Sequence, residues 1–247
     1  MLWNKGATFK DISEKYISFV IQNYKNATVV FDGYSVPSTK DHEHTRRCPL
    51  PLSRFIAISN EVKIPYSQDN YFSLKENKSE FVKFLSTSLR NAGIDVIECE
   101  ADADCCIAKT VLFYAKQKEG PIAAVFEDTD IAVMLLHHWK ERMEDIFVIQ
   151  RSFSRLWSVH KNQIHIASFK KNLLFIHSWS GCDTTSATHF KGKLKGLKTF
   201  QKSSKFRSQS DVISNANSSA KEVGQASVQA FKLLYGVNED LPLSKIR

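Results

Sequence analysis

Apolar residues along this chain follow two patterns in turn, a helical spacing of three to four residues and short unbroken runs. The helical spacing predicts helices over 9–25, from Asn77 or Ser79 to Asn91, over 102–117, 131–139 and 173–179, and over 220–235 ending at Gly236. The unbroken runs predict buried strands at 28–32, 94–97, 122–126, 145–150 and 163–167. Because strands alternate with helices, we expect an α/β fold with a mostly parallel sheet flanked by helices.

The same pattern divides the chain into segments. Residues 1–180 hold the alternating strands and helices and form the predicted core, with an irregular insertion over about 38–77. Residues 181–202 are rich in lysine and glycine, and residues 203–219, rich in Ser, Asn and Gln, are expected to be a linker. Residues 220–247 are predicted to form a C-terminal helix and a tail.

Composition indicates a folded protein and argues against disulfide-rich, secreted and membrane-spanning proteins. With 247 residues, 43% hydrophobic and 24% charged, the chain can bury a core. The formal net charge of +8 suits a polyanionic partner but does not require one. The five cysteines include an adjacent pair and no C-x-x-C spacing, which argues against a disulfide framework and a zinc site. The sequence has no signal-peptide pattern and no apolar run of about 18 residues, so we expect a soluble, intracellular protein.

Acidic residues gather where two of the predicted strands end and helices begin. The two clusters are Glu98, Glu100, Asp102 and Asp104, and then Glu127, Asp128 and Asp130. Residues two apart point the same way in extended backbone, so each cluster contains a pair able to share one ion. The pairs are Glu100 with Asp102, and Asp128 with Asp130.

Asp32 ends the first predicted strand in a similar way, although a turn Asp before Gly33 explains it equally well. Like charges beside buried strands repel one another, and a divalent cation relieves that repulsion. The pattern therefore predicts a Mg²⁺ or Mn²⁺ site at the carboxyl ends of adjacent parallel strands.

Basic residues form two segments suited to phosphate groups. In the first, Lys40 and Arg47 are seven residues apart and share a helical face, with Arg46 adjacent; a solvated helix with a Glu43–Arg47 pair is the alternative. In the second, glycines among lysines can hold phosphates through backbone N–H and ammonium groups; a basic solvent loop or a nuclear-import-like run is the alternative. The second segment comprises Lys191, Gly192, Lys193, Lys195, Gly196 and Lys198.

Four short motifs, in their order and spacing, resemble those of the flap-endonuclease superfamily of structure-specific nucleases, which is built on a PIN-like core. They are VVFDGY at 29–34, CEADA at 99–103, EDTD at 127–130 and GCD at 181–183. The resemblance covers roughly residues 15–200. It is closest to a group of uncharacterised PIN-like proteins that carry E-H-x-R-R and G-C-D-T-T-S-A, which stand here at 43–47 and 181–187.

The resemblance implies a site and a substrate. A pair of Mg²⁺ or Mn²⁺ ions would be bound by Asp32, Glu100, Asp102, Asp128, Asp130 and Asp183. Lys40 and Arg46 would stabilise the developing charge on the phosphate, while Arg47 and the second basic segment would hold nucleic acid. The insertion would be arch-like and 181–202 would be a helix–hairpin–helix-like segment. Branched or single-stranded DNA is the implied partner, with the nucleus favoured over the cytoplasm.

The chain departs from the family pattern in three places. The family has a further strand, upstream of the Asp32 motif, that ends in another metal-binding aspartate. This sequence begins on the helix before Asp32, so we expect that strand and its ligand to be missing. Asp102 stands where the family has the longer Glu, and the hairpin reads Gly192-Lys-Leu where the family has Gly-apolar-Gly.

Two functions therefore stay open. One is a Mg²⁺-dependent structure-specific nuclease, an endonuclease or 5′ nuclease, that hydrolyses phosphodiester bonds by a two-metal mechanism. The other is a truncated, catalytically inactive PIN-like protein that binds nucleic acid or a protein partner. The expected loss of the first strand favours the second function. A small-molecule phosphohydrolase is a third reading, which the basic excess disfavours.

Other chemistry-bearing residues are expected to be structural. The pairs His42 with His44 and His137 with His138 lack the i,i+4 spacing and the third ligand of a metal site. Cys182 has no base identifiable in the sequence and is expected to be a buried small hydrophobe.

Overall fold

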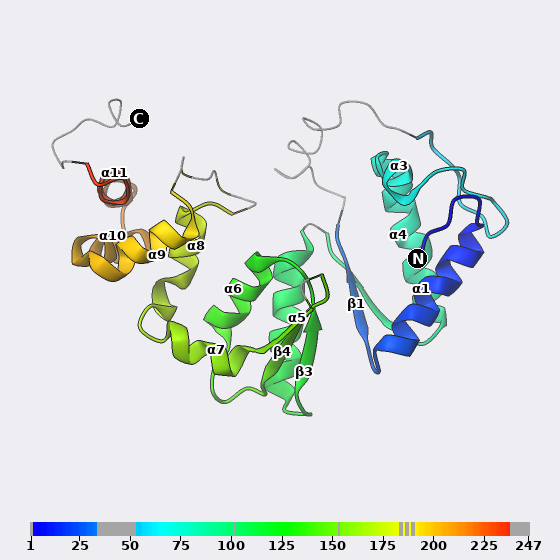
Figure 1. The fold of residues 1–247 in the computed structure, drawn as a ribbon, viewed down its shortest axis with the longest axis horizontal. Helices are drawn as coiled ribbons and strands as arrows, with labels where there is room; N and C mark the ends of the chain where they lie inside the picture. The colour runs from blue at the N-terminus through cyan, green and yellow to red at the C-terminus, as the bar shows by residue number, and fades with distance from the viewer. Residues whose placement is uncertain are drawn as a thin grey trace. The chain divides into compact units, whose positions relative to one another are not determined.

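The structure, a computed structural model, describes residues 2–33, 53–100, 102–152, 154–182, 185, 188 and 191–237. The chain is mixed α/β and divides into two compact units, Met1–Cys106 and Ile107–Arg247, each with its own sheet and hydrophobic core (Figure 1). The boundary falls inside the core predicted over 1–180, within helix α5 (Ala103–Gln117). No helix among the described residues is long and apolar enough to span a membrane.

The first unit is built on a parallel pair of strands and the helices that pack beside them. Its elements are α1 (Phe9–Asn23), β1 (Thr28–Phe31), α3 (Gln68–Phe72), α4 (Lys75–Asn91) and β2 (Asp95–Glu98). Strands β1 and β2 pair in parallel, with Val30 opposite Ile97. Helix α1 begins at a capping box, because the Thr8 and Asp11 side chains each accept the other residue's backbone N–H. The core is a cluster of aromatic rings that includes Trp3, Phe9, Tyr71 and Phe81.

Helix α4 begins earlier than the predicted start at Asn77 or Ser79. Asn77 does not cap the helix, because its side chain has other partners. Its buried Nδ2 donates to Ser53 Oγ, Arg54 O and Tyr71 O. Its Oδ1 accepts the Ile56 N–H at 3.0 Å. An amide carries both donors and an acceptor, so one buried side chain satisfies several backbone groups of a neighbouring loop. Asn77 therefore anchors that loop to helix α4 and does not act as the N-cap of the helix.

The second unit contains a sheet, the helices that cover it and a group of C-terminal helices. Its elements after α5 are β3 (Ile122–Val125), α6 (Thr129–His138), β4 (Ile146–Gln150), β5 (Arg155–Ser158), α7 (Val159–Ile166), the 3₁₀ turn η1 (Lys170–Asn172), α8 (Leu173–Trp179), α9 (Lys193–Lys202), α10 (Ser204–Ser214) and α11 (Ala220–Tyr235). Strand β3 pairs in parallel with β4, and β4 pairs antiparallel with β5. Ala124, Ile146 and Val148 of the sheet are buried in one core with residues of α5 and α6. The predicted strands at 122–126 and 145–150 and the helix between them are confirmed.

The prediction of a strand at 163–167 is wrong, because nearly all of these residues lie in helix α7. The preceding segment forms strand β5, which the sequence pattern missed. Ser158 marks the change from strand to helix, since its Oγ accepts the Lys161 N–H at 3.0 Å and donates to Asp145 Oδ2 at 2.6 Å. Because β5 runs antiparallel to β4, the sheet of this unit is only partly parallel.

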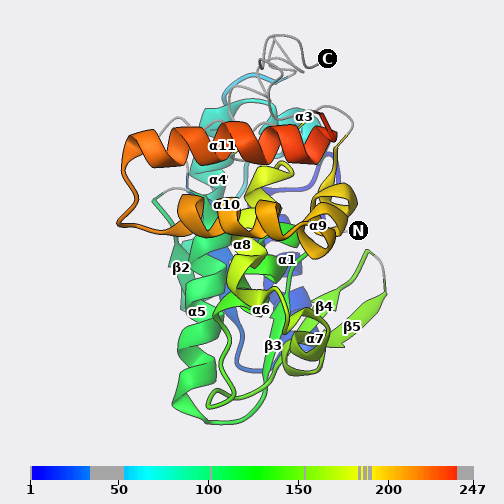
Figure 2. The same ribbon diagram turned by 90° about the vertical axis from the view of Figure 1, so that its left-hand side faces the viewer.

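Helix α10 occupies most of the segment predicted to be a linker over 203–219, so that prediction is corrected. Ser203 caps the helix by accepting the Phe206 N–H at 3.1 Å, and the Phe206 ring is buried among residues of α8, α9 and α11. Helices α10 and α11 lie side by side (Figure 2). The stability of this polar helix therefore comes from tertiary packing, which composition does not reveal. Helix α11 ends as predicted at Gly236, whose φ is 68°.

Candidate metal centre

The predicted carboxylates lie directly after the strands. In the first unit, Asp32 follows β1 and Asp102 comes shortly after β2, and the parallel pairing places both at one edge of that sheet. The Asp32 carboxylate accepts the N–H of Ala103, the first residue of α5, at 3.0 Å. Asp32 and Asp102 therefore both lie at the N-terminus of α5, where Asp102 is half-buried, while Asp32 and Glu100 are exposed.

The thiol of Cys99 belongs to the same acidic neighbourhood. Burial, together with the hydrogen bond to Cys106 and the negative charges of Asp32 and Asp102, raises the pKa of Cys99 to about 12. A thiol with this pKa stays protonated at neutral pH. Cys99 is therefore a poor nucleophile at neutral pH, and Asp32 and Asp102 lie close enough to contribute to its pKa.

Two of the carboxylates start the helices that follow the strands. Asp102 Oδ1 accepts the Asp104 N–H at 2.8 Å, and Asp128 Oδ1 accepts the Asp130 N–H at 2.7 Å. Negative charge is favourable at a helix N-terminus, so capping accounts for part of the acidic pattern. Each capping bond uses one carboxylate oxygen, and a carboxylate has two. Capping and cation binding are therefore compatible at Asp128.

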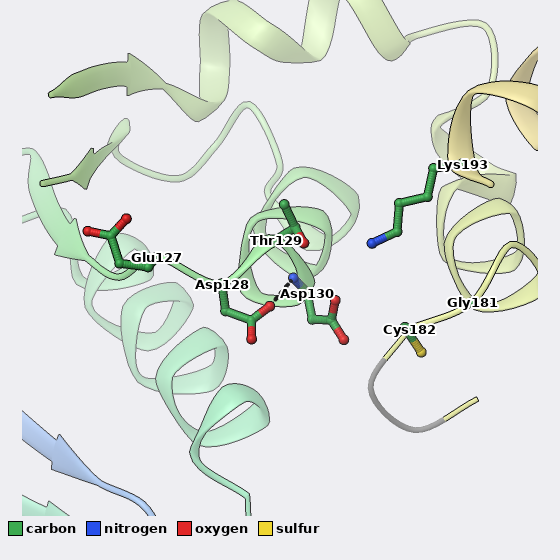
Figure 3. A pocket seen from close by; sticks show the side chains of 7 residues that line it. All are labelled: Glu127, Asp128, Thr129, Asp130, Gly181, Cys182 and Lys193. Carbon is green, nitrogen blue, oxygen red and sulfur yellow. Dashed lines mark hydrogen bonds between the residues drawn. The ribbon is translucent and has the colours of Figure 1, made fainter. Parts of the chain in front are cut away.

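A pocket of about 420 Å³ lies at the start of α6 in the second unit (Figure 3). It is lined by Glu127, Asp128, Thr129, Asp130, Gly181, Cys182 and Lys193. Figure 3 shows the Lys193 side chain extending from α9 toward the Asp130 side of the pocket, while the Glu127 carboxylate points away. Glu127 accepts the Ser152 N–H at 3.0 Å. Acidic groups and an ammonium group that share one pocket suit a phosphate together with its cation.

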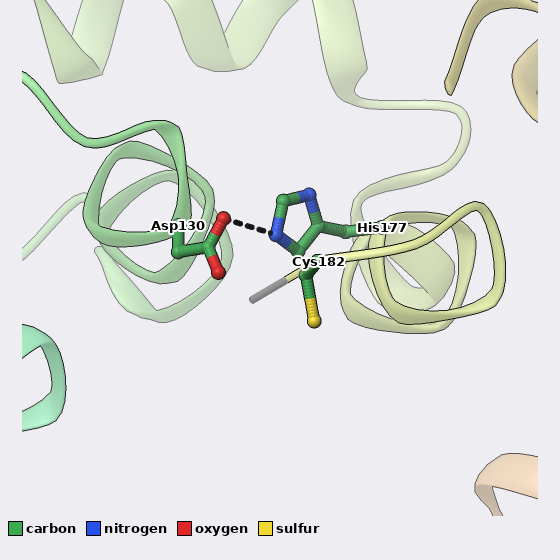
Figure 4. A group of neighbouring side chains, drawn as sticks. All are labelled: Asp130, His177 and Cys182. Atoms are coloured by element: carbon green, nitrogen blue, oxygen red, sulfur yellow. Dashed lines mark hydrogen bonds and ion pairs between the residues drawn. The ribbon is translucent and has the colours of Figure 1, made fainter. Parts of the chain in front are cut away.

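Asp130 has a close partner that sequence reasoning missed, His177 of α8. Its Nε2 lies 2.9 Å from Asp130 Oδ1, and the His177 and Asp130 side chains are only 10% and 17% exposed. With Cys182 Sγ they form a group whose ligand atoms all lie within 4.8 Å of one another (Figure 4). The only signal in the sequence is a histidine in an otherwise apolar helix five residues before Cys182, while its partner Asp130 is 47 residues away.

The turn after α8 sets the place of Cys182. Gly181 has a φ of 98°, a conformation that favours glycine. The Cys182 N–H donates to Thr185 Oγ1 at 3.1 Å, and Cys182 Sγ lies 3.3 Å from the same oxygen. Thr185 in turn donates to the Ser178 carbonyl oxygen at 2.8 Å. Cys182 is half-buried and lines the pocket, so the prediction of a buried hydrophobe is wrong.

The second basic segment leads into helix α9. The side chains of Lys193, Lys195 and Lys198 are exposed. Lys191 is half-buried, with its Nζ 5.3 Å from the centre of the Tyr235 ring, a cation–π contact. Three exposed lysines on one helix are consistent with a polyanion-binding surface.

The two glycines of this segment have different places in the helix. Gly192 is the exposed N-cap of α9. Gly196 is buried, and its N–H donates to the Gly192 carbonyl oxygen at 3.1 Å. The predicted role of Gly196 in binding phosphate through its N–H is therefore corrected, because that N–H is already used. A Cβ at this position would lie 3.5 Å from Ser180 Cβ, so Gly196 packs α9 closely against the end of α8.

Several predicted residues lie outside the part of the chain that the structure describes. They are Lys40, Arg46, Arg47, Asp183, His42 and His44. Glu100 belongs to the first unit with Asp32 and Asp102, whereas Asp128 and Asp130 belong to the second. The gathering of all six predicted carboxylates around a pair of ions therefore stays a prediction.

His137 has its Nδ1 2.9 Å from the Lys170 carbonyl oxygen.

Comparisons with known proteins give little further guidance. No protein-family model matches the chain, and no curated protein matches it. Among solved structures, the chain is similar to the catalytic core of Rad2 in complex with DNA substrate. The identity is 13%, the match covers 97% of this chain and 70% of that chain, and the TM-score is 0.47. A similarity at this level decides nothing about the site, whose interpretation depends on the residues themselves.

Proposed function

We propose that the chain binds Mg²⁺ or Mn²⁺ at the carboxylates that follow its strands and hydrolyses phosphodiester bonds in nucleic acid. The observation that carries this proposal is the pocket that Asp128 and Asp130 share with Lys193. Carboxylate oxygens are the ligands these cations prefer, and a nearby ammonium group can hold the substrate phosphate. The four motifs that resemble the flap-endonuclease superfamily support the same reaction.

The residues present fit such an ion. Asp128 and Asp130 are half-buried, so placing their like charges side by side is costly unless a cation binds between them. Asp128 has a second carboxylate oxygen beside the one that caps α6. At the start of α5, Asp32 and Asp102 each accept a backbone N–H through Oδ1. As the resemblance implies, the chemistry supplied by bound ions would be activation of a water molecule and neutralisation of the leaving oxygen.

The chain's own basic residues position the substrate in this proposal. Lys193 neutralises a phosphate in the pocket, and Lys195 and Lys198 lie one helical turn apart and extend the positive surface along α9. Lys40 and Arg46, as the resemblance implies, stabilise the developing charge of the reacting phosphate. Branched or single-stranded DNA is the proposed substrate class.

The test combines Mg²⁺ binding by calorimetry with cleavage of a 5′-flap DNA by the full chain. The wild type is expected to bind Mg²⁺ and to cleave, and Asp130→Asn to lose cleavage by roughly 100-fold or more. Glu119→Gln, an exposed acid beyond the end of α5, is the matched control and keeps both properties. Absence of Mg²⁺ binding by the wild type, or full cleavage by Asp130→Asn, overturns the proposal.

A catalytically inactive protein that binds nucleic acid or a protein partner is the alternative. The Asp130–His177 pair favours it, because a histidine bonded to the carboxylate stabilises the carboxylate without a metal. In this alternative the flap DNA binds in an electrophoretic mobility assay, but no Mg²⁺ or Mn²⁺ concentration produces cleavage. Restoration of cleavage by His177→Gln would show instead that the pair competes with the ion.

A further inference from the structure

We propose that Asp130, His177 and Cys182 form a binding site for a divalent transition-metal ion of the Zn²⁺ class. The carboxylate oxygen, the imidazole nitrogen and the thiol sulfur come from the start of α6, from α8 and from the turn after α8. This proposal deepens the proposed function and rests on it in one respect, since Asp130 is an ion ligand in both. The two differ in the ion, which is a transition metal here and Mg²⁺ or Mn²⁺ in the proposed function.

The spacing of the three atoms suits a small ion after a modest adjustment. Tetrahedral Zn²⁺ has Zn–N and Zn–O distances of about 2.0–2.1 Å and a Zn–S distance of about 2.3 Å, so its ligand atoms lie roughly 3.3–3.6 Å apart. Asp130 Oδ1 and His177 Nε2 are 2.9 Å apart and would separate slightly. All three atoms lie within 4.8 Å of one another, so Cys182 Sγ needs to approach the other two by at most about 1.5 Å.

The surroundings hold each ligand near this position. The His177 and Asp130 side chains are largely buried, so their geometry is restricted by packing. The bonds between Thr185 and both the N–H and the Sγ of Cys182 tie the sulfur to the end of α8. Hydrogen-bonded neighbours of this kind orient ligands in metal sites.

The donor set selects the class of metal. Mg²⁺ prefers oxygen ligands, whereas nitrogen and sulfur donors favour Zn²⁺, Co²⁺ and related ions. An ionised carboxylate can only accept a hydrogen bond, so with Asp130 ionised His177 donates from Nε2. Metal binding at Nε2 of the neutral ring moves that proton to Nδ1, and metal binding at Cys182 releases the thiol proton to solvent. A set of three protein ligands leaves one tetrahedral position for water or a substrate oxygen, as in catalytic zinc sites.

The sequence alone argued against zinc, because it has no C-x-x-C spacing. The structure changes that interpretation, since the three ligands come from separate parts of the chain and meet only through the packing of α6 against α8. Asp128 and Lys193 line the same pocket as Asp130 and Cys182. A metal-bound water or phosphate oxygen would therefore have both an acid and an ammonium group nearby.

The test uses Co²⁺ as a coloured substitute for Zn²⁺ and the full chain treated with a chelator. Wild type is expected to develop a sulfur-to-cobalt charge-transfer band and intense tetrahedral visible bands, both lost when Zn²⁺ is added. Cys182→Ser is expected to lose the charge-transfer band, and His177→Gln and Asp130→Asn to weaken Co²⁺ binding at least tenfold. Cys105→Ser and His165→Gln, at exposed positions on α5 and α7, are the matched controls and behave as wild type.

A second measurement on the wild type needs no variant. Zn²⁺ is expected to slow alkylation of Cys182 by iodoacetamide, as mapped by mass spectrometry, and to leave the exposed Cys105 reacting at its usual rate. A cobalt spectrum without a charge-transfer band overturns the proposal, and so does equal alkylation of Cys182 with and without Zn²⁺.

The outcomes separate this proposal from the proposed function. If the wild type cleaves flap DNA with Mg²⁺ but shows no cobalt–thiolate band, the transition-metal site is refuted and the nuclease function stands. If the cobalt site forms as described but neither Mg²⁺, Mn²⁺ nor Zn²⁺ supports cleavage, the function is refuted and the metal site stands.

Discussion

Replacing Gly196 with alanine is expected to stabilise the second unit. Gly196 lies inside helix α9, where alanine is the most favourable residue. A Cβ at this position would lie 3.5 Å from Ser180 Cβ and 4.0 Å from Ile176 Cγ2. These are ordinary van der Waals separations, so the methyl group fits between α8 and α9 without displacing either helix.

The size of the effect follows from two contributions. Glycine in a helix interior is about 0.8–1.0 kcal/mol less favourable than alanine. Burying the added methyl group contributes up to about 0.8 kcal/mol more. The free energy of unfolding should therefore rise by about 1–2 kcal/mol, and the melting temperature by about 2–8 °C. Gly224→Ala is the matched control, because a Cβ added to Gly224 in α11 would meet no atom within 4 Å and the variant gains only the helix-propensity contribution.

Urea denaturation of the wild type and both variants measures these differences. Binding of single-stranded DNA, followed by fluorescence anisotropy, should be the same for Gly196→Ala as for the wild type, because the Gly196 N–H is bonded within the helix. A destabilised Gly196→Ala beside a stabilised Gly224→Ala would refute the fit of the methyl group and show that α8 and α9 pack too closely to accept it. Loss of DNA affinity at unchanged stability would restore the phosphate-binding role of Gly196.

Three further predictions concern the first unit and the basic surface. Burial and, to a smaller extent, the charge of Glu80 raise the pKa of Tyr71 to about 12, and the Tyr71 hydroxyl has no hydrogen-bond partner among the described residues. The unfolded chain loses this proton near pH 10, before the folded protein does, so stability should fall as the pH rises from about 10 to 12. Tyr71→Phe should reduce that fall and leave stability at pH 7 equal or higher, as measured by urea denaturation. Asn77→Ala should lower the free energy of unfolding by about 3 kcal/mol or more, because it leaves several buried backbone groups unpaired. The double variant Lys195→Glu, Lys198→Glu should weaken DNA binding and lower the slope of log affinity against log salt by about 2, as measured by anisotropy at several salt concentrations.

Controls for these predictions come from exposed positions on α4 and α5. Asn91→Ala, at the exposed end of α4, should change stability by no more than about 0.5 kcal/mol. Lys109→Glu with Lys116→Glu places the same charge change on α5, and an equal loss of DNA binding there would show that net charge, not the α9 surface, is responsible. If the stability of Tyr71→Phe fell between pH 10 and 12 as much as that of the wild type, the raised pKa of the buried Tyr71 would be refuted. If Asn77→Ala lowered the free energy of unfolding only slightly, the anchoring role of Asn77 would be refuted.

Much of the fold follows from local patterns. The spacing of apolar residues predicts α1, α5, α6 and α11, because each buries one face and the period of that face appears directly in the sequence. The positions of the carboxylates at the strand ends also follow from the sequence, because a buried strand must stop where charged residues begin. Two segments escape this logic. The alternation at 163–167 is too short to separate strand from helix, and α10 is polar on most of its surface.

What the sequence by itself determined is the order of most helices and strands and the position of acidic residues at their junctions, because both depend on neighbours a few residues apart. Only the tertiary structure decided which of those acids acquire partners. Asp130 meets His177 and Cys182 because α6 packs against α8, and Asn77 meets a loop that precedes it by more than twenty residues. Such contacts join groups far apart in the chain, and burial gives them their strength, so no local pattern of residues contains them.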